Sequence, residues 1–211
     1  AVSPLTSTGS SSAPAALGAG YKLSGTNPFG FHLLAVSFHL ISTGLVFALG
    51  LRWFGVLAAA IAAGAFGLTP IHTESVAWIS GMAEPLTASV GLSAGLAQLH
   101  TADLWQTPGK TARAMLWSIA TFALYCAAYF TKETAVTIPV IITISDCLLT
   151  RAWKLPRLLA AIPAGVGFIP YLIARISVFG VWAGLAIHQT DFRLPRWRML
   201  TLPHELYGQY L

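Results

Sequence analysis

FHLLAVSFHLISTGLVFALG, residues 31–50, is the stretch of sequence that decides the fold class. It is mostly apolar and long enough to cross a membrane, because a helix needs about 20 mostly apolar residues to span the hydrocarbon core of a bilayer. The next run, WFGVLAAAIAAGAFGLT at residues 53–69, has few polar side chains and is rich in Ala and Gly, which lets helix backbones approach closely. Both stretches predict transmembrane helices.

Further apolar segments follow at residues 85–100, 115–130, 134–149 and 158–178. Apolar residues make up 55% of the 211-residue chain and charged residues only 9%, against about a quarter in soluble domains. We therefore expect an all-α polytopic membrane helix bundle of about six transmembrane helices over residues 31–178. The net charge of +5 does not indicate nucleic-acid binding, because the basic residues are scattered between apolar runs.

The segments on either side of the predicted bundle differ from it in composition. Residues 1–30 are rich in Ser, Ala and Gly without a sustained period, which predicts a loop at the outer face of the membrane. Residues 179–211 mix aromatic and basic side chains, a combination typical of the membrane–water interface. This composition predicts an outer interfacial segment that includes Trp182, Trp197, Tyr207, Tyr210, Arg193, Arg196 and Arg198.

Basic residues in the short loops predict the orientation, because such residues favour the cytoplasmic side. Placing the loop after residue 50 inside also puts most of the other short-loop bases inside: Arg52, Lys110, Arg113, Arg151, Lys154 and Arg157. Residues 70–84, the turn at 131–133 and both termini then lie outside. A bacterial inner membrane is the expected location.

Ionisable residues within the apolar segments are functional candidates by default. His32 and His39 are seven residues apart on one helix face and are candidate ligands of a metal or pigment through neutral imidazole. The commoner alternative is a hydrogen bond from each histidine to a neighbouring helix. Asp146 is expected to pair with a base near Arg151.

The stretch Pro70-Ile-His-Thr-Glu-Ser-Val-Ala-Trp-Ile-Ser-Gly81 places His72 and Glu74 at the predicted outer mouth of two helices. An enzyme acting on a lipid-linked substrate would hold its acid, base or metal ligand there. The two side chains are suited to a shared ligand only if the backbone between them is extended. The alternative is local structure, with Pro70 ending one helix and Glu74 in the first turn of a short helix.

Three stretches resemble successive motifs of one family: Asn-Pro-Phe-Gly-Phe-His-Leu at 27–33, the motif at 70–81, and Lys-Glu-Thr-Ala-Val-Thr at 132–137. The family is that of the bacterial relatives of the transmembrane and tetratricopeptide-repeat-containing O-mannosyltransferases, which have the GT-C membrane fold. Tyr-Leu-Ile-Ala-Arg at 171–175 and Leu-Thr-Leu-Pro at 200–203 resemble the same family more weakly.

The resemblance implies transfer of a sugar from a polyprenyl-phosphate carrier to a protein or other acceptor at the outer membrane face. The donor would be a lipid-linked sugar, and a divalent metal is a candidate cofactor. Substrate-mouth candidates are His72, Glu74 and Glu84, and carrier-phosphate candidates are Lys132, Glu133 and Arg175. The alternative for Lys132 and Glu133 is a helix start, with Thr131 as N-cap.

Some positions depart from the family pattern. The family's catalytic acid lies on an outer loop after an earlier helix, but no Asp or Glu precedes Glu74 here. Met82 stands where the family has a base, and Thr69 where it has a histidine, while Glu84 keeps an acid. We therefore expect an incomplete or degenerate piece of such an enzyme. A non-catalytic structural subunit of a larger membrane protein complex is the alternative.

Overall fold

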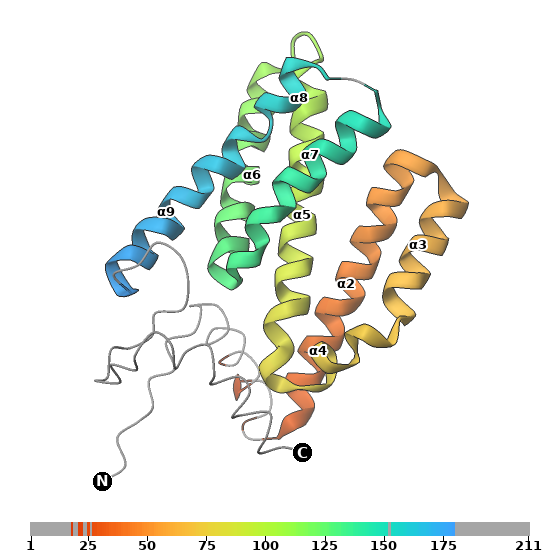
Figure 1. Ribbon diagram of the computed structural model, residues 1–211, viewed down its shortest axis with the longest axis vertical. Coiled ribbons are helices and arrows are strands. Elements are labelled where there is room, and N and C mark those ends of the chain that lie inside the picture. The colour runs from red at the N-terminus through yellow and green to blue at the C-terminus, as the bar shows by residue number, and fades with distance from the viewer. Residues whose placement is uncertain (1–17, 19–20, 23–24, 26, 152, 180–211) are drawn as a thin grey trace, which may run out of the picture. The chain divides into compact units, whose positions relative to one another are not determined.

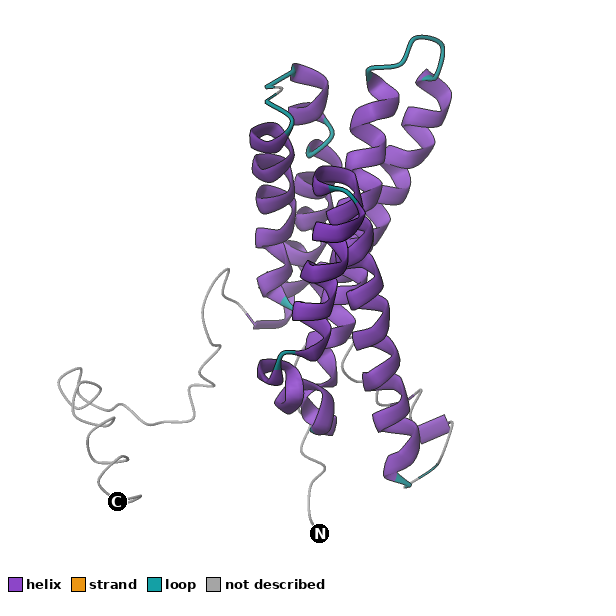
Figure 2. Cartoon of the chain, turned by 90° about the vertical axis from the view of Figure 1, so that its right-hand side faces the viewer, coloured by secondary structure: helices purple, strands orange, loops and turns teal. Residues whose placement is uncertain are grey.

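The computed structural model describes residues 18, 21–22, 25, 27–151 and 153–179, and the elements of this part of the chain are all helical (Figures 1 and 2). Most of the predicted outer loop at 1–30 and nearly all of the predicted interfacial segment at 179–211 lie outside these residues. The chain divides into two compact units, Ala1–Ala174 and Arg175–Leu211. The bundle described below belongs to the first unit, apart from the last residues of its final helix, which fall in the second.

Helices α2 (Pro28–Phe54) and α3 (Val56–Leu68) form an antiparallel hairpin. The Asn27 side chain caps α2 by accepting a hydrogen bond of 2.9 Å from the backbone N–H of Phe29. The hairpin turns at Gly55, whose φ of 81° lies in the left-handed region that favours glycine. The two helices then pack closely, because a Cβ added at Gly50 would come within 2.8 Å of the Ala59 backbone.

Three short helical elements replace the predicted outer loop at 70–84. They are the 3-10 helix η1 (Pro70–His72), the helix α4 (Thr73–Ala77) and the 3-10 helix η2 (Ile79–Met82). The axis bends by 45° between α3 and the segment Pro70–Ala77. This bend turns the chain from the end of α3 towards the start of the long helix α5 (Ala83–Trp105).

Helix α5 is the central element of the bundle, with α2 on one side and α6 (Thr111–Thr131) on the other (Figure 1). The chain continues through η3 (Glu133–Val136), α7 (Thr137–Leu149), α8 (Leu155–Leu159) and α9 (Ile162–Phe179). Both α7 and α8 also contact α5.

The core between α5, α6, α7 and α9 combines small residues with hydrogen-bonded polar ones. Tyr125 is fully buried and its hydroxyl donates to Gln98 Oε1 at 2.7 Å, while Gln98 Nε2 donates to Thr143 at 2.7 Å. The Tyr129 hydroxyl donates to the carbonyl of Ala164 at 3.0 Å. Such pairing is needed inside a membrane bundle, because lipid offers no hydrogen bonds to buried polar groups.

All six predicted apolar segments contain a helix, but the described helices differ in their ability to cross a bilayer. Three are long and apolar enough, namely Pro28–Phe54, Thr111–Thr131 and Leu155–Ser177, and the bent pair Val56–Leu68 with Pro70–Ala77 raises the number to four. Helix α7 has only 13 residues, which gives it a length of about 20 Å. The model thus supports a membrane helix bundle, and the number six stays a prediction.

Candidate functional site

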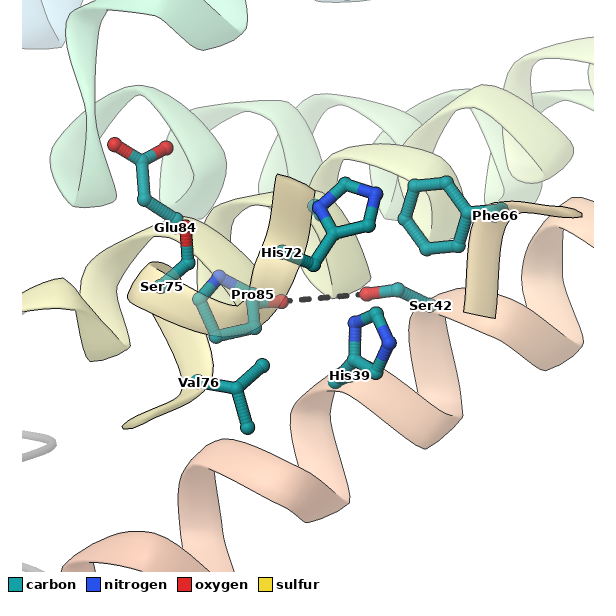
Figure 3. Close-up of a pocket in the computed structure, with 9 residues that line it drawn as sticks. His39, Ser42, Phe66, His72, Ser75, Val76, Glu84 and Pro85 are labelled. Carbon is teal, nitrogen blue, oxygen red and sulfur yellow. Dashed lines mark hydrogen bonds between the residues drawn. The ribbon is translucent and has the colours of Figure 1, made fainter. Parts of the chain in front are cut away.

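A pocket of about 160 Å³ lies where α2, the end of α3, α4 and the start of α5 meet (Figure 3). It combines aromatic, hydroxyl and acidic side chains. The residues that line it are His39, Ser42, Phe66, His72, Ser75, Val76, Glu84, Pro85 and Ala88. Two of the sequence-predicted mouth residues, His72 and Glu84, are among them.

Three aromatic rings form one wall of this pocket. The His72 ring centroid lies 4.6 Å from that of Phe66 and 5.3 Å from that of His39. His39 Nε2 also donates a hydrogen bond of 3.1 Å to the carbonyl of Gly67 on α3. For His39, therefore, the structure shows the hydrogen bond to a neighbouring helix that was one of the two sequence-based alternatives.

The bend after α3 positions His72 but separates it from Glu74. Pro70 begins η1, and both His72 and the residues of α4 have helical backbone conformations rather than extended ones. Residues two apart on such a backbone point in divergent directions. Glu74 is accordingly exposed in the first turn of α4, and the pocket is lined by Glu84 instead. The local-structure interpretation of Glu74 is the one that the backbone follows.

Glu84 also forms an ion pair with Lys132. Their side chains are 48% and 36% exposed, so water reaches both charges. The pair joins the start of α5 to the residue after α6, and it places residues 70–84 and Lys132 at the same end of the bundle. Both residues are candidates from the sequence, but their contact was not predicted.

Residues next to Lys132 differ from the predicted helix start. Lys132 stands at the N-cap position of η3, where Thr131 was expected, and the Thr131 hydroxyl donates instead to carbonyls of its own helix. Glu133 occupies the first turn of η3, as expected, and is exposed. Its carboxylate accepts a hydrogen bond of 3.5 Å from the hydroxyl of Tyr171 on α9.

The remaining candidates are not gathered at the pocket. His32 is exposed on α2, whereas His39 is half-buried, so the seven-residue spacing puts them in different surroundings. Among the described residues, no group of three or more His, Cys, Asp or Glu side chains is arranged to hold a metal ion. Arg175 is the first residue of the second compact unit and lies within α9.

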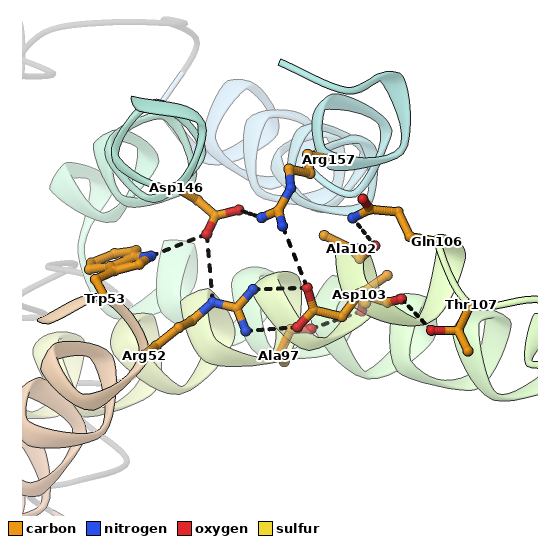
Figure 4. Close-up of polar contacts among 10 residues, drawn as sticks. Arg52, Trp53, Ala97, Ala102, Asp103, Gln106, Thr107, Asp146 and Arg157 are labelled. Atoms are coloured by element: carbon orange, nitrogen blue, oxygen red, sulfur yellow. Dashed lines mark hydrogen bonds and ion pairs between the residues drawn. The ribbon is translucent and has the colours of Figure 1, made fainter. Parts of the chain in front are cut away.

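A second polar site, the four-charge cluster, lies at the opposite end of α5 (Figure 4). Arg52 donates two hydrogen bonds to Asp103, at 2.7 and 3.0 Å, and its Nε lies 3.6 Å from Asp146. Arg157 pairs with Asp146 and lies 3.9 Å from Asp103. Trp53 Nε1 also donates to Asp146, at 3.1 Å.

The expectation that Asp146 pairs with a base at this end of its helix is confirmed, and the base is Arg157 rather than Arg151. Arg151 has a φ of 51° in the turn that follows α7, and it is exposed. Arg157, on the next helix α8, pairs with the carboxylate of Asp146. A sequence signal was present, because Arg52, Asp103 and Asp146 each lie near the same end of a predicted helix.

Apolar helices, buried polar groups with partners, and polar sites at the helix ends together define an integral membrane helix protein. Comparison with known proteins narrows this class. The chain is 34% identical to the protein O-mannosyl-transferase Tmtc2 of Drosophila melanogaster over 125 residues, which are 59% of this chain and 13% of that protein.

Other relatives belong to the same group. The chain is 33% identical to Tmtc1 of the same fly over 61% of its length and 14% of the relative's, and 25% identical to human TMTC3 over 75% and 17%. The matches thus span about one-seventh of the length of these relatives, and they support a relationship with the TMTC O-mannosyltransferases. Neither a protein-family model nor a solved structure matches the chain.

Proposed function

We propose that this chain is part of a membrane glycosyltransferase-like protein that transfers a sugar from a polyprenyl-phosphate carrier to a protein or other acceptor. The names of the relatives suggest mannose as the sugar. The observation that carries the proposal is the Glu84–Lys132 ion pair beside the pocket that Glu84 also lines. The proposal includes a GT-C-like bundle with six spans, with this pocket on the outer face of a bacterial inner membrane and both chain termini outside.

Lys132 is suited to the phosphate of a membrane-bound carrier. It follows directly after α6, one of the helices long and apolar enough to span a bilayer, so its ammonium group lies at a helix end. An ammonium group there meets a phosphate at the depth of the lipid headgroups, where attraction is only partly screened. Its present partner, Glu84, is a carboxylate that is half exposed, so the ion pair is weak and a carrier phosphate can compete with it for the ammonium group.

The other candidates take roles around this contact. His72 and Glu84 line the pocket and are proposed as its substrate-facing groups. Glu133, held by Tyr171, is proposed to orient the neighbouring lysine. The roles proposed for Glu74 at the substrate mouth and for Arg175 at the carrier phosphate rest on the family resemblance alone. No step of this proposal passes through a metal, because the described residues do not assemble a ligand set.

The test is binding of a short-chain polyprenyl phosphate to the intact protein in lipid nanodiscs. Lys132→Ala removes a charge-assisted contact and should weaken binding about tenfold to a hundredfold. Lys132→Arg keeps the charge and should retain most of the affinity. Lys110→Ala is the matched control, because Lys110 is an exposed lysine that precedes the other end of α6.

Thermal unfolding of each variant shows that the fold is intact. An unchanged affinity in a folded Lys132→Ala protein contradicts carrier binding at this site. That result would leave the non-catalytic subunit of a membrane complex as the better account of the chain.

A further inference from the structure

The end of the bundle that holds the four-charge cluster has a surplus of positive charge. Six basic and two acidic side chains lie in and around the cluster, which gives a net charge of +4. They are Arg52, Lys110, Arg113, Arg151, Lys154 and Arg157, with Asp103 and Asp146. Both acids are engaged by Arg52 and Arg157, so within the described residues this end has no further acid for the other bases.

Three of these bases form a surface that we call the basic rim: Arg113, Arg151 and Lys154. All three are exposed, and none of them forms an ion pair with a described residue. Arg113 lies in the first turn of α6, where the positive end of the helix dipole disfavours a cation. Its charge therefore has no stabilising role in the local structure.

The basic rim lies at the ends of helices that are long and apolar enough to cross a bilayer. Arg113 is the third residue of the candidate span Thr111–Thr131, and Lys154 directly precedes the candidate span Leu155–Ser177. The start of α6 and the helix α8 lie at the same end of the bundle (Figure 1). Bases at the ends of membrane spans lie at the depth of the lipid headgroups.

Exposed tryptophans accompany these bases. Trp153 lies in the turn between α7 and α8 and is 61% exposed, and Trp117, one turn after Arg113 on α6, is 39% exposed. The His100 ring of α5 packs edge-on against Trp117 with the ring centroids 4.6 Å apart, which fixes this indole at the surface. Indole rings are enriched at the membrane–water interface. Their presence favours a lipid headgroup over a soluble anion as the partner of the rim.

We propose that the basic rim binds the headgroups of anionic phospholipids, with their phosphates at Arg113, Arg151 and Lys154. Bases next to an anionic membrane surface each raise the affinity about fivefold. Bases in short loops also orient a chain during insertion, but the rim would keep its lipid contact in the folded protein. The inference does not rest on the proposed function, because Lys132 lies at the other end of α6.

The experiment compares two phospholipids with identical acyl chains, phosphatidylglycerol and phosphatidylcholine. Each is titrated onto the purified protein in detergent micelles, where both ends of the bundle are accessible, and bound lipid is counted by native mass spectrometry. The ratio of the two dissociation constants measures the preference for the anionic headgroup. We expect the unmodified protein to bind phosphatidylglycerol about tenfold or more tightly.

Two triple variants test whether the rim carries this preference. Arg113→Gln with Arg151→Gln and Lys154→Gln removes the three charges and should lower the ratio at least about fivefold. Arg113→Lys with Arg151→Lys and Lys154→Arg keeps the charges and should retain most of the ratio. The three residues are exposed, so neither variant should change the thermal unfolding temperature much.

A pair of single variants provides a matched control. Lys154→Gln removes one of three bases in the seven residues 151–157, whereas Lys22→Gln removes an exposed lysine that is the only base before Arg52. Lys154→Gln should lower the ratio several-fold, and Lys22→Gln should leave it nearly unchanged, because clustered bases bind anionic lipid better than isolated ones.

Three results would contradict the inference. The first is equal affinity of the unmodified protein for the two lipids. The second is a full ratio in the folded variant without the three charges, which would place the preference elsewhere in the chain. The third is an equal loss of the ratio in Lys22→Gln and Lys154→Gln, because the effect would then depend on net charge and not on the rim. Failure of the carrier-binding test at Lys132 would leave this inference unchanged.

Discussion

At the scale of single residues, Asp146 has the most demanding surroundings in the described bundle. Its side chain is 3% exposed, and it interacts with Arg157, Arg52 and Trp53. A buried carboxylate needs such partners, because the loss of hydration is large. The partners come from α2 and α8, so the carboxylate on α7 links three helices.

We predict that Asp146→Asn strongly destabilises the protein. The change leaves the half-buried guanidinium of Arg157 without its carboxylate, and breaking a buried pair typically costs about 3–5 kcal/mol. Asp103→Asn is the matched control, because the Asp103 side chain is 42% exposed and its loss should cost only about 1 kcal/mol. Unfolding in a mixed detergent series measures both.

The double variant Asp146→Asn with Arg157→Met tests the cause. Removing the unpaired cation should recover part of the stability, so the two effects should not add. Additive losses, or equal losses for Asp146→Asn and Asp103→Asn, would contradict an energetic role for this buried pair.

At this scale, the sequence predicts the features that depend on residues close together in the chain. The first-turn positions of Glu74 and Glu133 followed from Pro70 and from the acid preference of helix starts. The Glu84–Lys132 pair spans 48 residues, and the Arg52–Asp103 pair spans 51. Such pairs depend on how the helices pack, which hydropathy does not specify.

At the scale of elements, the α2–α3 hairpin depends on one close contact. Gly50 is buried on α2, and a Cβ there would come within 2.8 Å of the Ala59 Cα and 2.9 Å of its Cβ. Backbone atoms cannot move aside as a side-chain tip can. The small-residue composition of 53–69 predicted close packing of this kind.

We predict that Gly50→Ala destabilises the protein by about 1–3 kcal/mol, because the two helices must separate to admit the methyl group. Gly44→Ala is the matched control on the same helix, since a Cβ there meets nothing within 4 Å. Alanine at that position should be neutral or stabilise the helix by up to about 1 kcal/mol. If both variants unfold alike, the close approach of α2 and α3 does not limit stability.

The element boundaries show which signals the hydropathy prediction missed. The predicted helix at 31–50 extends over Pro28–Phe54, because Asn27 is an N-cap and Pro28 suits the first turn. The residues 70–84, predicted as a loop, are largely helical. These elements are too short to show a periodic apolar pattern in the sequence. Helices this short depend on tertiary contacts, which α2 and α5 provide here.

At the scale of the whole chain, the ionisable side chains of the bundle gather at two levels. One contains the Glu84–Lys132 pair, and the other contains the four-charge cluster, at the opposite end of α5. The apolar surfaces between them are widely exposed, as with Ile61 at 65% and Ile119 at 64%. Charged residues at two levels with exposed apolar helices between them are what a bilayer requires.

The last prediction concerns the orientation of the chain in that bilayer. The bases of the short loops favour the cytoplasm for the end that carries Lys110 and Lys154, so the end that carries Glu74 and Glu133 should face outwards. The four positions are all exposed and suit single cysteines in a chain whose Cys126 and Cys147 have been replaced. In intact cells, a thiol reagent that cannot cross the membrane should modify cysteines at 74 and 133. Cysteines at 110 and 154 should react only after the membrane is opened.

Because Lys132 pairs with Glu84, positions 74 and 133 must behave alike, and labelling of one without the other contradicts the packing of α5 against α6. Labelling of 110 and 154 alone in intact cells would keep the bundle but reverse its orientation, and the proposed outer site would then face the cytoplasm.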